Sequence, residues 1–200
     1  MDLNEYLTEQ HKKGRQLIFD LDDTIYVETQ FLFKVYKEIA QTAINVNPNL
    51  IYDFLKKTFI DEGRKNLFNK LKSSFPSESF SLDKSLSIMR NYKCDHCIET
   101  LPWFRKLLSN MSSEFVIKII TNGTPQQQHN KIKSIKFSWP EELIEVVYAS
   151  SYAAKPKVLS FYQLKGVEKF ISPIYVGDSL TDEQFCKKLN IEFYDIKKIL

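Results

Sequence analysis

Apolar residues recur along this chain in two different rhythms. Short apolar runs, typical of buried strands, occur at residues 16–20, 115–120, 145–149, 174–176 and 191–194. Between about residues 30 and 98 the apolar positions instead recur every three or four residues, as on the buried face of an amphipathic helix. Leu32, Val35 and Ile39 illustrate this spacing. The pattern therefore predicts one strand, then a block of helices without a strand, then four further strands.

The second half of the chain alternates between predicted strands and helices. Helices are expected to begin near Pro125, Pro156 and Thr181. In the second of these, Val158, Leu159 and Tyr162 are expected to face inward and Gly166 to end the helix. Strands that alternate with helices favour a parallel sheet with right-handed crossovers.

The order of these elements predicts an α/β fold with an insertion. Because the helical block interrupts the alternation directly after the first strand, residues 1–25 and 100–200 are predicted to form a Rossmann-like core. This core is a five-stranded parallel sheet between two layers of helices, a three-layer α/β/α arrangement. Residues 26–99 are predicted to form an α-helical cap joined to the core by two linkers.

Length and composition agree with a globular chain of this kind. With 200 residues and 43% hydrophobic composition, the chain is large enough for one domain that carries an insertion. It contains no apolar run of 18 residues and no charged-then-apolar leader. We therefore expect a soluble, cytoplasmic protein that enters no membrane. The net charge of +3 is mild and does not indicate nucleic-acid binding.

The chain contains three cysteines. An odd number does not indicate a disulfide framework, and a reducing compartment fits better. Cys94, His96 and Cys97 lie close together and suggest a zinc site. A structural zinc site normally needs four ligands, however, and no second cluster repeats the spacing. A hinge or core packing is the alternative, because the segment lies where the cap rejoins the core.

Polar side chains gather where the predicted strands end. Asp20, Asp22 and Asp23 follow the first strand, and carboxylates at the end of a buried strand are costly unless something binds them. The later strands are followed by Thr121 and Asn122, by Lys155, and by Asp178 and Asp182. The carboxyl ends of parallel strands face one edge of the sheet, where ligands bind. Carboxylates, a lysine, a hydroxyl and two helix N-termini at one edge suit a phosphate ester with a divalent cation.

Taken in order, these residues resemble the four motifs of the haloacid dehalogenase superfamily. The segment Asp20-Leu21-Asp22-Asp23-Thr24 is similar to the Asp-x-Asp-x-Thr motif that follows the first strand. Thr121 stands at the second motif and Lys155 at the third. Gly177-Asp178, with Asp182 four residues on, is similar to the fourth. The helical insertion after the first motif resembles the subclass whose cap lies at that point.

The resemblance implies a phosphatase mechanism. Asp20 would attack phosphorus and form an aspartyl-phosphate. Asp22 would protonate the leaving alkoxide and then deprotonate the attacking water, for which we expect its pKa to be raised by the neighbouring acids. Thr121, the Asn122 backbone N–H and Lys155 would hold the phosphoryl oxygens as charge redistributes in the transition state.

The resemblance also implies a Mg²⁺ site. The Asp20 carboxylate, the Asp22 backbone carbonyl and Asp178 would hold the ion, and Asp182 would support it through water. Asp182 has a second explanation, since an acid in a first helical turn is favoured by the helix dipole alone. Lys155 could equally be a surface lysine, and Thr121 a strand-end hydroxyl that caps backbone. Asp23 is interpreted as a structural turn or surface acid.

We expect a Mg²⁺-dependent phosphatase that acts on a small phosphorylated metabolite, such as a sugar phosphate or a nucleoside monophosphate, as a monomer or homodimer. Arg64, beside Gly63 in a cap turn, is either a substrate contact or a solvated surface charge. Asp22 argues against a metal-independent 2-haloacid dehalogenase, which needs no acid two residues after the nucleophile. A phosphomutase and a non-catalytic phospho-ligand-binding module would also be compatible with this core.

Overall fold

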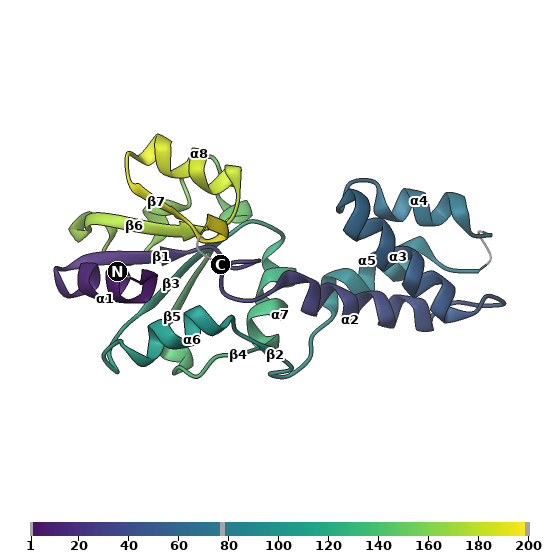
Figure 1. Ribbon diagram of the computed structural model, residues 1–200. Coiled ribbons are helices and arrows are strands. Elements are labelled where there is room, and N and C mark those ends of the chain that lie inside the picture. Colours follow the sequence, from purple (N-terminus) through teal and green to yellow (C-terminus); the bar gives the residue numbers. More distant parts are fainter. Residues whose placement is uncertain (1, 77–78, 199–200) are drawn as a thin grey trace. The chain divides into compact units, whose positions relative to one another are not determined.

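The computed structural model describes residues 2–76 and 79–198, which divide into two compact units (Figure 1). The first unit contains the described residues up to Glu28 and from Cys94 onward, and the second runs from Thr29 to Lys93. The sequence pattern places the two boundaries after residues 25 and 99. The first unit extends further because Lys131 Nζ donates to Glu28 Oε1 at 2.6 Å and the Cys94 N–H donates to Ser134 Oγ at 3.1 Å. Residues 1, 77–78 and 199–200 of the predicted ranges lie outside the described residues.

A five-stranded parallel sheet forms the centre of the first unit, as predicted. Its spatial order is β5-β3-β1-β6-β7. The strands are β1 (Arg15–Phe19), β3 (Ile117–Thr121), β5 (Ile144–Tyr148), β6 (Ile171–Gly177) and β7 (Glu192–Asp195). β1 lies in the middle, with β3 on one side and β6 on the other, so the strand order reverses there. Ligands bind outside the carboxyl ends of strands at such a switch point, which is where the residues after Phe19 lie.

Helices cover both faces of this sheet (Figure 1). They are α1 (Leu3–Lys12), α6 (Pro102–Ser109), α7 (Pro125–Ser134) and α8 (Leu180–Leu189). Phe19 of β1 packs edge-on against Phe104 of α6, with ring centroids 5.3 Å apart. Its neighbour Ile18 belongs to another buried cluster, together with Tyr175 of β6 and Phe185 of α8. Because successive strand residues point to opposite faces, the apolar run in β1 builds both interfaces of a three-layer α/β/α core.

The regular secondary structure in the described residues of the second unit consists of helices alone. Its helices are α2 (Glu28–Gln41), α3 (Pro48–Glu62), α4 (Leu67–Ser74) and α5 (Leu82–Asn91). Aromatic pairs join them: Tyr36 of α2 lies 6.1 Å from Phe59 of α3, and Phe54 lies 5.5 Å from Phe75, measured between ring centroids. This agrees with the helical spacing of the sequence. Among the described residues of both units, no helix has the length and apolar character needed to cross a membrane.

A second, two-stranded parallel sheet in the first unit is absent from the sequence prediction. It pairs β2 (Ile98–Glu99) with β4 (Ile135–Lys136), the segment that follows α7 directly. Each strand has only two residues, too few for an alternating pattern to be visible in the sequence. The pairing ties the segment after Cys97 to the end of α7.

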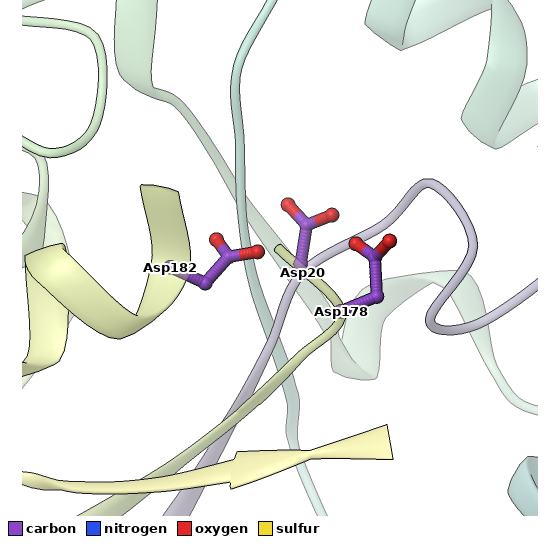
Figure 2. A group of neighbouring side chains, drawn as sticks. All are labelled: Asp20, Asp178 and Asp182. Carbon is purple, nitrogen blue, oxygen red and sulfur yellow. The ribbon is translucent and has the colours of Figure 1, made fainter. Parts of the chain in front are cut away.

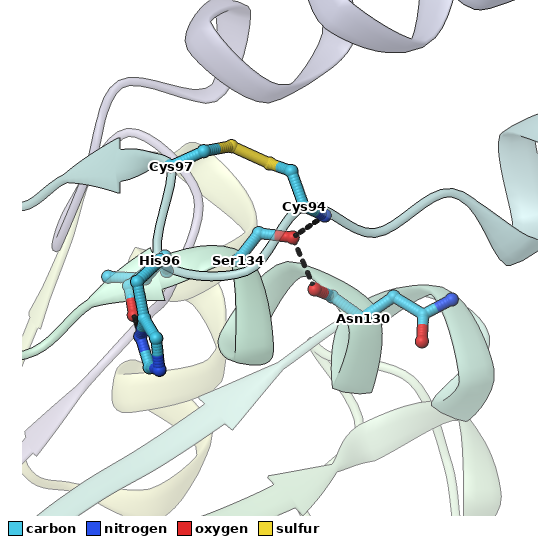
Figure 3. Close-up of a disulfide and its surroundings, with 6 residues drawn as sticks. Cys94, His96, Cys97, Asn130 and Ser134 are labelled. Atoms are coloured by element: carbon cyan, nitrogen blue, oxygen red, sulfur yellow. Dashed lines mark hydrogen bonds between the residues drawn. A yellow bond between two sulfur atoms is a disulfide. The ribbon is translucent and has the colours of Figure 1, made fainter.

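A disulfide joins Cys94 and Cys97 beside this small sheet (Figure 3). The sequence argued against a wider disulfide framework and did not predict this local bridge, because a Cys-x-x-Cys turn can close on itself without such a framework. Cys186 is free and buried. The bridge also excludes the zinc interpretation in this state, since metal binding requires thiolates. Two contacts anchor the segment. The Cys94 N–H donates to Ser134 Oγ, and His96 Nδ1 lies 3.3 Å from the Ile135 carbonyl oxygen.

Thiol titration tests the disulfide. The denatured, unreduced protein is expected to contain one reactive thiol per chain, that of Cys186, and three after reduction. Reduction is expected to lower the free energy of unfolding by no more than about 2 kcal/mol, because the loop is short and short loops constrain the unfolded chain least. A Cys97→Ser variant serves as the control and is expected to contain two thiols without reduction. Three thiols in the unreduced wild type would contradict the bridge.

The prediction that a helix begins at Pro156 is wrong. Turns and two short 3-10 helices, Phe161–Gln163 and Val167–Lys169, occupy this segment. Leu159 and Tyr162, expected to face inward, are 55% and 58% exposed, whereas Phe161 and Leu164 are buried. In a 3-10 turn the same face recurs every three residues, which fits the buried pair and not the predicted set. The apolar residues here are dense enough to suit either period, so the pattern alone could not decide.

Candidate active site

Asp20 is the first residue after β1, at the carboxyl edge of the middle strand. Its backbone N–H donates to the Val176 carbonyl oxygen of β6 at 2.9 Å, so the sheet fixes its position. The side chain is buried, and Lys155 Nζ donates to its Oδ1 at 2.6 Å. Burial raises the pKa of Asp20 to about 7 despite this ammonium. The nearby carboxylates of Asp182 and Asp22 add to the effect.

Lys155 follows β5 in a loop, and its side chain is only 2% exposed. Besides Asp20, its Nζ lies 2.5 Å from Asp182 Oδ1 and 2.7 Å from the Tyr175 hydroxyl oxygen. Burial by itself would lower the pKa of Lys155, but the two carboxylates outweigh burial and raise it. Lys155 is therefore a buried ammonium held between Asp20 and Asp182, and the interpretation as a surface lysine is wrong.

Three carboxylates form a cluster that could hold a metal ion (Figure 2). Asp20, Asp178 and Asp182 each offer an oxygen, and these oxygens lie within 4.8 Å of one another. The residues come from the end of β1, the end of β6 and the first turn of α8. Burial raises the pKa of Asp178, while Lys197, whose Nζ lies 2.5 Å from Asp178 Oδ2, opposes the shift. Hard divalent cations prefer carboxylate oxygens, so the donor set fits Mg²⁺.

Asp182 is engaged by donors on both oxygens. Oδ1 accepts from Lys155, and Oδ2 accepts from the Ser179 hydroxyl at 2.5 Å. Ser179 Oγ in turn accepts from the Asp182 N–H at 3.2 Å, a reciprocal capping box that begins α8. Gly177 makes the close approach possible, because an added Cβ would lie 2.9 Å from the Asp182 side chain. These contacts make Asp182 a partner of Lys155 as well as a member of the acidic cluster.

Thr121 and Asn122 follow the same edge at the end of β3. The Thr121 side chain is buried, and its hydroxyl donates to the Asn122 carbonyl oxygen at 3.2 Å, which is the strand-end capping that the sequence also allowed. Asn122 Oδ1 accepts from the Lys155 N–H at 2.8 Å, and its Nδ2 donates to the Lys155 carbonyl oxygen at 3.2 Å. The Asn122 side chain therefore fixes the backbone of Lys155 against β3.

Among the described contacts, Asp22 accepts hydrogen bonds from the side chains of Lys131, Tyr26 and Gln128. Lys131 Nζ lies 2.8 Å from its Oδ1 and 2.7 Å from its Oδ2. The Tyr26 hydroxyl donates to Oδ1 at 2.5 Å, and Gln128 Nε2 donates to Oδ2 at 3.3 Å. From the sequence, we expect the pKa of Asp22 to be raised by neighbouring acids. That expectation leaves out the ammonium of Lys131, which contacts both Asp22 oxygens.

Comparison with known families adds the decisive observation. A family model described as haloacid dehalogenase-like hydrolase matches residues 17–196. The chain belongs to the haloacid dehalogenase-like hydrolases. No curated protein was found to match it.

Three solved structures show the fold that this haloacid dehalogenase-like hydrolase shares. The hydrolase YfnB from Bacillus subtilis, bound to magnesium, is 18% identical with a TM-score of 0.60, covering 90% of this chain and 85% of that one. A protein described as a phosphoglycolate phosphatase, from Lactobacillus plantarum, is 18% identical with a TM-score of 0.50, covering 90% and 84%. The defluorinating L-2-haloacid dehalogenase Rha0230 is 12% identical with a TM-score of 0.54, covering 90% and 79%.

Asp23 and Arg64 were also singled out in the sequence. Asp23 has a positive φ of 53°, and its Oδ1 accepts from the Glu28 N–H at 2.9 Å, so it is a turn residue. Arg64 lies in the second unit, directly after Gly63, the C-cap of α3. Its substrate contact stays a prediction.

Tyr175 and Lys131 are among the residues that contact the site but are not marked in the sequence of this hydrolase. Tyr175 looks like part of an apolar strand, yet its hydroxyl contacts Lys155 Nζ and donates to the Ile120 carbonyl oxygen at 3.0 Å. Lys131 lies in α7, whose polar composition suggests a solvated helix, yet Lys131 is 1% exposed. Gln128, three residues earlier on α7, is buried too. No motif marks either residue, and only the fold reveals them.

Proposed function

We propose that this hydrolase is a Mg²⁺-dependent phosphatase that cleaves a small phosphate monoester through an aspartyl-phosphate on Asp20. The observation that carries the proposal is the Lys155 ammonium between Asp20 and Asp182, which together with Asp178 form the cluster of three carboxylates. An ammonium next to a cation site suits the phosphoryl group, whose transfer depends mainly on positioning and on charge stabilisation. A sugar phosphate or a nucleoside monophosphate is the proposed kind of substrate.

The cation would be held by the carboxylates of Asp20 and Asp178 and by the backbone carbonyl of Asp22. When bound, Mg²⁺ would supply charge stabilisation to the phosphoryl oxygens. Asp182 is proposed to support the site mainly through Lys155, because its Oδ1 holds the ammonium that also contacts Asp20. The magnesium in the structure of YfnB, which shares this fold, is consistent with the choice of ion.

The proposed reaction has two half-reactions. In the first, an Asp20 oxygen forms a bond to phosphorus as the ester P–O bond breaks, and Asp22 gives a proton to the leaving oxygen. In the second, Asp22 takes a proton from water, the water oxygen attacks phosphorus, and the bond to Asp20 breaks. Inorganic phosphate leaves, and both aspartates return to their starting states. Lys155, Thr121 and the Asn122 N–H would hold the phosphoryl oxygens during both steps.

Three other functions compete with this proposal. A 2-haloacid dehalogenase, as Rha0230 is described, would use Asp20 as a nucleophile but would need neither Asp22 nor a cation. A phosphomutase would retain the phosphoryl group and release no inorganic phosphate. A non-catalytic phospho-ligand-binding module would be expected to lack one of the acids or the lysine, and this chain has all of them. A cytoplasmic location and a monomeric or homodimeric state belong to the proposal as well.

A substrate screen tests the proposed function. The wild-type protein is expected to release inorganic phosphate from at least one sugar phosphate or nucleoside monophosphate when Mg²⁺ is present, and to stop when EDTA removes it. Mg²⁺ alone is also expected to raise the melting temperature, because it binds the native state and not the unfolded chain. Halide release from 2-chloropropionate without metal would favour the dehalogenase. Inactivity on all esters with Mg²⁺ present would contradict the proposal.

A further inference from the structure

We propose that Lys131 and Glu28 form a positioning pair that orients the Asp22 carboxyl group for proton transfer to the leaving group. The inference rests on the proposed phosphatase function and adds two residues to it. Neither residue belongs to the motifs found in the sequence. Lys131 lies on α7, and Glu28 is the first residue of α2.

The contacts of Lys131 are unusual for a lysine in a polar helix. Its side chain is 1% exposed, and in the described contacts its Nζ lies within hydrogen-bond distance of three carboxylate oxygens. Two belong to Asp22, at 2.8 and 2.7 Å, and one is Glu28 Oε1, at 2.6 Å. Glu28 is also buried, at 5% exposure. The ammonium therefore bridges the proposed acid–base residue to a second buried acid.

The contact of Lys131 with both oxygens of Asp22 determines how that carboxyl group can act. An ammonium in contact with both oxygens fixes the position of the carboxyl group, and a separate donor on each oxygen resists its rotation about the Cβ–Cγ bond. The hydroxyl of Tyr26 and the amide of Gln128 add one donor to each oxygen. A general acid must present one oxygen to the leaving group within hydrogen-bond reach, and small errors of placement are costly. When that oxygen carries the proton, the other can still accept from Lys131.

Glu28 closes a ring of contacts around Asp22. Its carboxylate holds Lys131 Nζ, and its backbone N–H donates to Asp23 Oδ1 at 2.9 Å. Asp23 is the neighbour of Asp22 in the chain, so Glu28 contacts the Asp23 side chain directly and the Asp22 side chain through Lys131. The positive φ of Asp23 is part of the same turn.

Stability alone does not explain this arrangement. Taking two carboxylates and an ammonium out of water is costly, and well-packed apolar residues in such places are often at least as stabilising. A buried ion pair that grips the proposed acid–base group is better explained by its effect on that group. The pair of Lys118 and Glu145, with Nζ 2.6 Å from Oε2, joins neighbouring strands β3 and β5 and contacts none of the proposed site residues in the described contacts. It therefore provides a matched control.

The experiment compares two leaving groups in the Lys131→Met and Glu28→Gln variants. An alkyl phosphate needs a proton on its leaving oxygen, whereas p-nitrophenolate leaves without one. Stopped-flow measurement of the first equivalent of product isolates formation of the aspartyl-phosphate. Lys131→Met is expected to slow this step about 10- to 100-fold for the alkyl ester and less than about 3-fold for p-nitrophenyl phosphate. Glu28→Gln is expected to change the ratio of the rates on the two esters in the same direction by a smaller factor. Lys131→Arg is expected to restore part of the wild-type ratio.

A second comparison uses Asp22→Asn as the background. If Lys131 acts through Asp22, Lys131→Met is expected to add less than about 2-fold to the loss on the alkyl ester once Asp22 is replaced. Lys118→Met is expected to leave the ratio of the two esters unchanged. Equal losses on both esters, or a full additional loss in the Asp22→Asn background, would reduce Lys131 to a structural residue and overturn the inference. If Lys131→Met does not fold, the ratio for Glu28→Gln decides. A wild type inactive on both esters would instead refute the proposed function.

Discussion

Replacing Asp20 with asparagine is expected to lower turnover of phosphate esters by about 10⁴-fold or more. The amide cannot form the aspartyl-phosphate, although it keeps the size of the side chain and can still accept a hydrogen bond from Lys155. The measurement is kcat on the best ester from the substrate screen, together with mass spectrometry of rapidly quenched protein. Wild type is expected to carry one phosphoryl group during turnover and the variant none. Turnover near the wild-type value would remove Asp20 as the nucleophile.

The same substitution is expected to stabilise the metal-free protein at alkaline pH. Because the pKa of Asp20 is raised from 3.8 to about 7, the native state binds this proton more tightly than the unfolded chain does. The contribution of Asp20 to the free energy of unfolding therefore falls as the pH rises through this window, by at most about 1.4 kcal/mol per pH unit. Asparagine has no charge to bury and escapes this loss.

Urea unfolding with EDTA present measures the effect. The Asp20→Asn variant is expected to unfold at higher urea than wild type near pH 8, and the difference is expected to shrink toward pH 4. Mg²⁺ is expected to narrow the difference near pH 8, because it binds the wild-type carboxylate. A variant less stable than wild type near pH 8 would indicate that the contact with Lys155 outweighs the cost of burying the charge.

The central part of the site could be predicted because strand ends are visible in a sequence. The apolar run before Asp20 marks a buried strand, and parallel strands bring their carboxyl ends to one edge whatever their separation in the chain. Lys155 and Asp182, 27 residues apart, meet there at 2.5 Å as this rule requires. A local pattern and one topological rule were sufficient.

The partners beneath the site could not be predicted in this way. Lys131 and Tyr175 are recognised by what they contact, and neither their spacing nor their neighbours in the chain mark them. Lys131 follows the segment Gln126-Gln127-Gln128-His129-Asn130, whose polar character is typical of a solvated helix. Its burial depends on Asp22 and Glu28, more than 100 residues earlier in the sequence. Local propensity carries no information about contacts at that distance.

The remaining errors arose where two local structures compete. The segment after Pro156 suits an α-helix or a series of 3-10 turns, and tertiary packing of Phe161 chose the turns. The cysteine count argued against a disulfide framework and did not reveal the bridge, but Cys94 and Cys97 are close enough in sequence to pair without help from the rest of the fold. In both cases the local sequence is compatible with either structure. The three-dimensional contacts that decide between the two structures cannot be read from the local sequence.

Replacing Lys155 with methionine is expected to have the second large effect, on turnover and on stability together. The substitution leaves the carboxylates of Asp20 and Asp182 buried, without the ammonium that lies 2.6 and 2.5 Å from them. Breaking a buried pair from one side typically costs about 3–5 kcal/mol, because the partner's charge stays buried without compensation. Turnover is expected to fall by about 10³-fold, since the variant loses an ammonium that would hold the phosphoryl oxygens.

The dependence on pH and on metal distinguishes this explanation from a simple packing defect. Near pH 5 Asp20 is largely protonated in the native state, because its pKa is about 7, so the loss of stability in Lys155→Met is expected to be smaller there than near pH 8. Mg²⁺ near pH 8 is expected to restore part of the stability by neutralising the same carboxylates. Lys106→Met, which removes an exposed ion pair with Asp2, is the control and is expected to leave stability nearly unchanged at either pH. A loss in Lys155→Met that is the same at both pH values and insensitive to Mg²⁺ would mean that Lys155 supports the fold through packing of its side chain rather than through its charge.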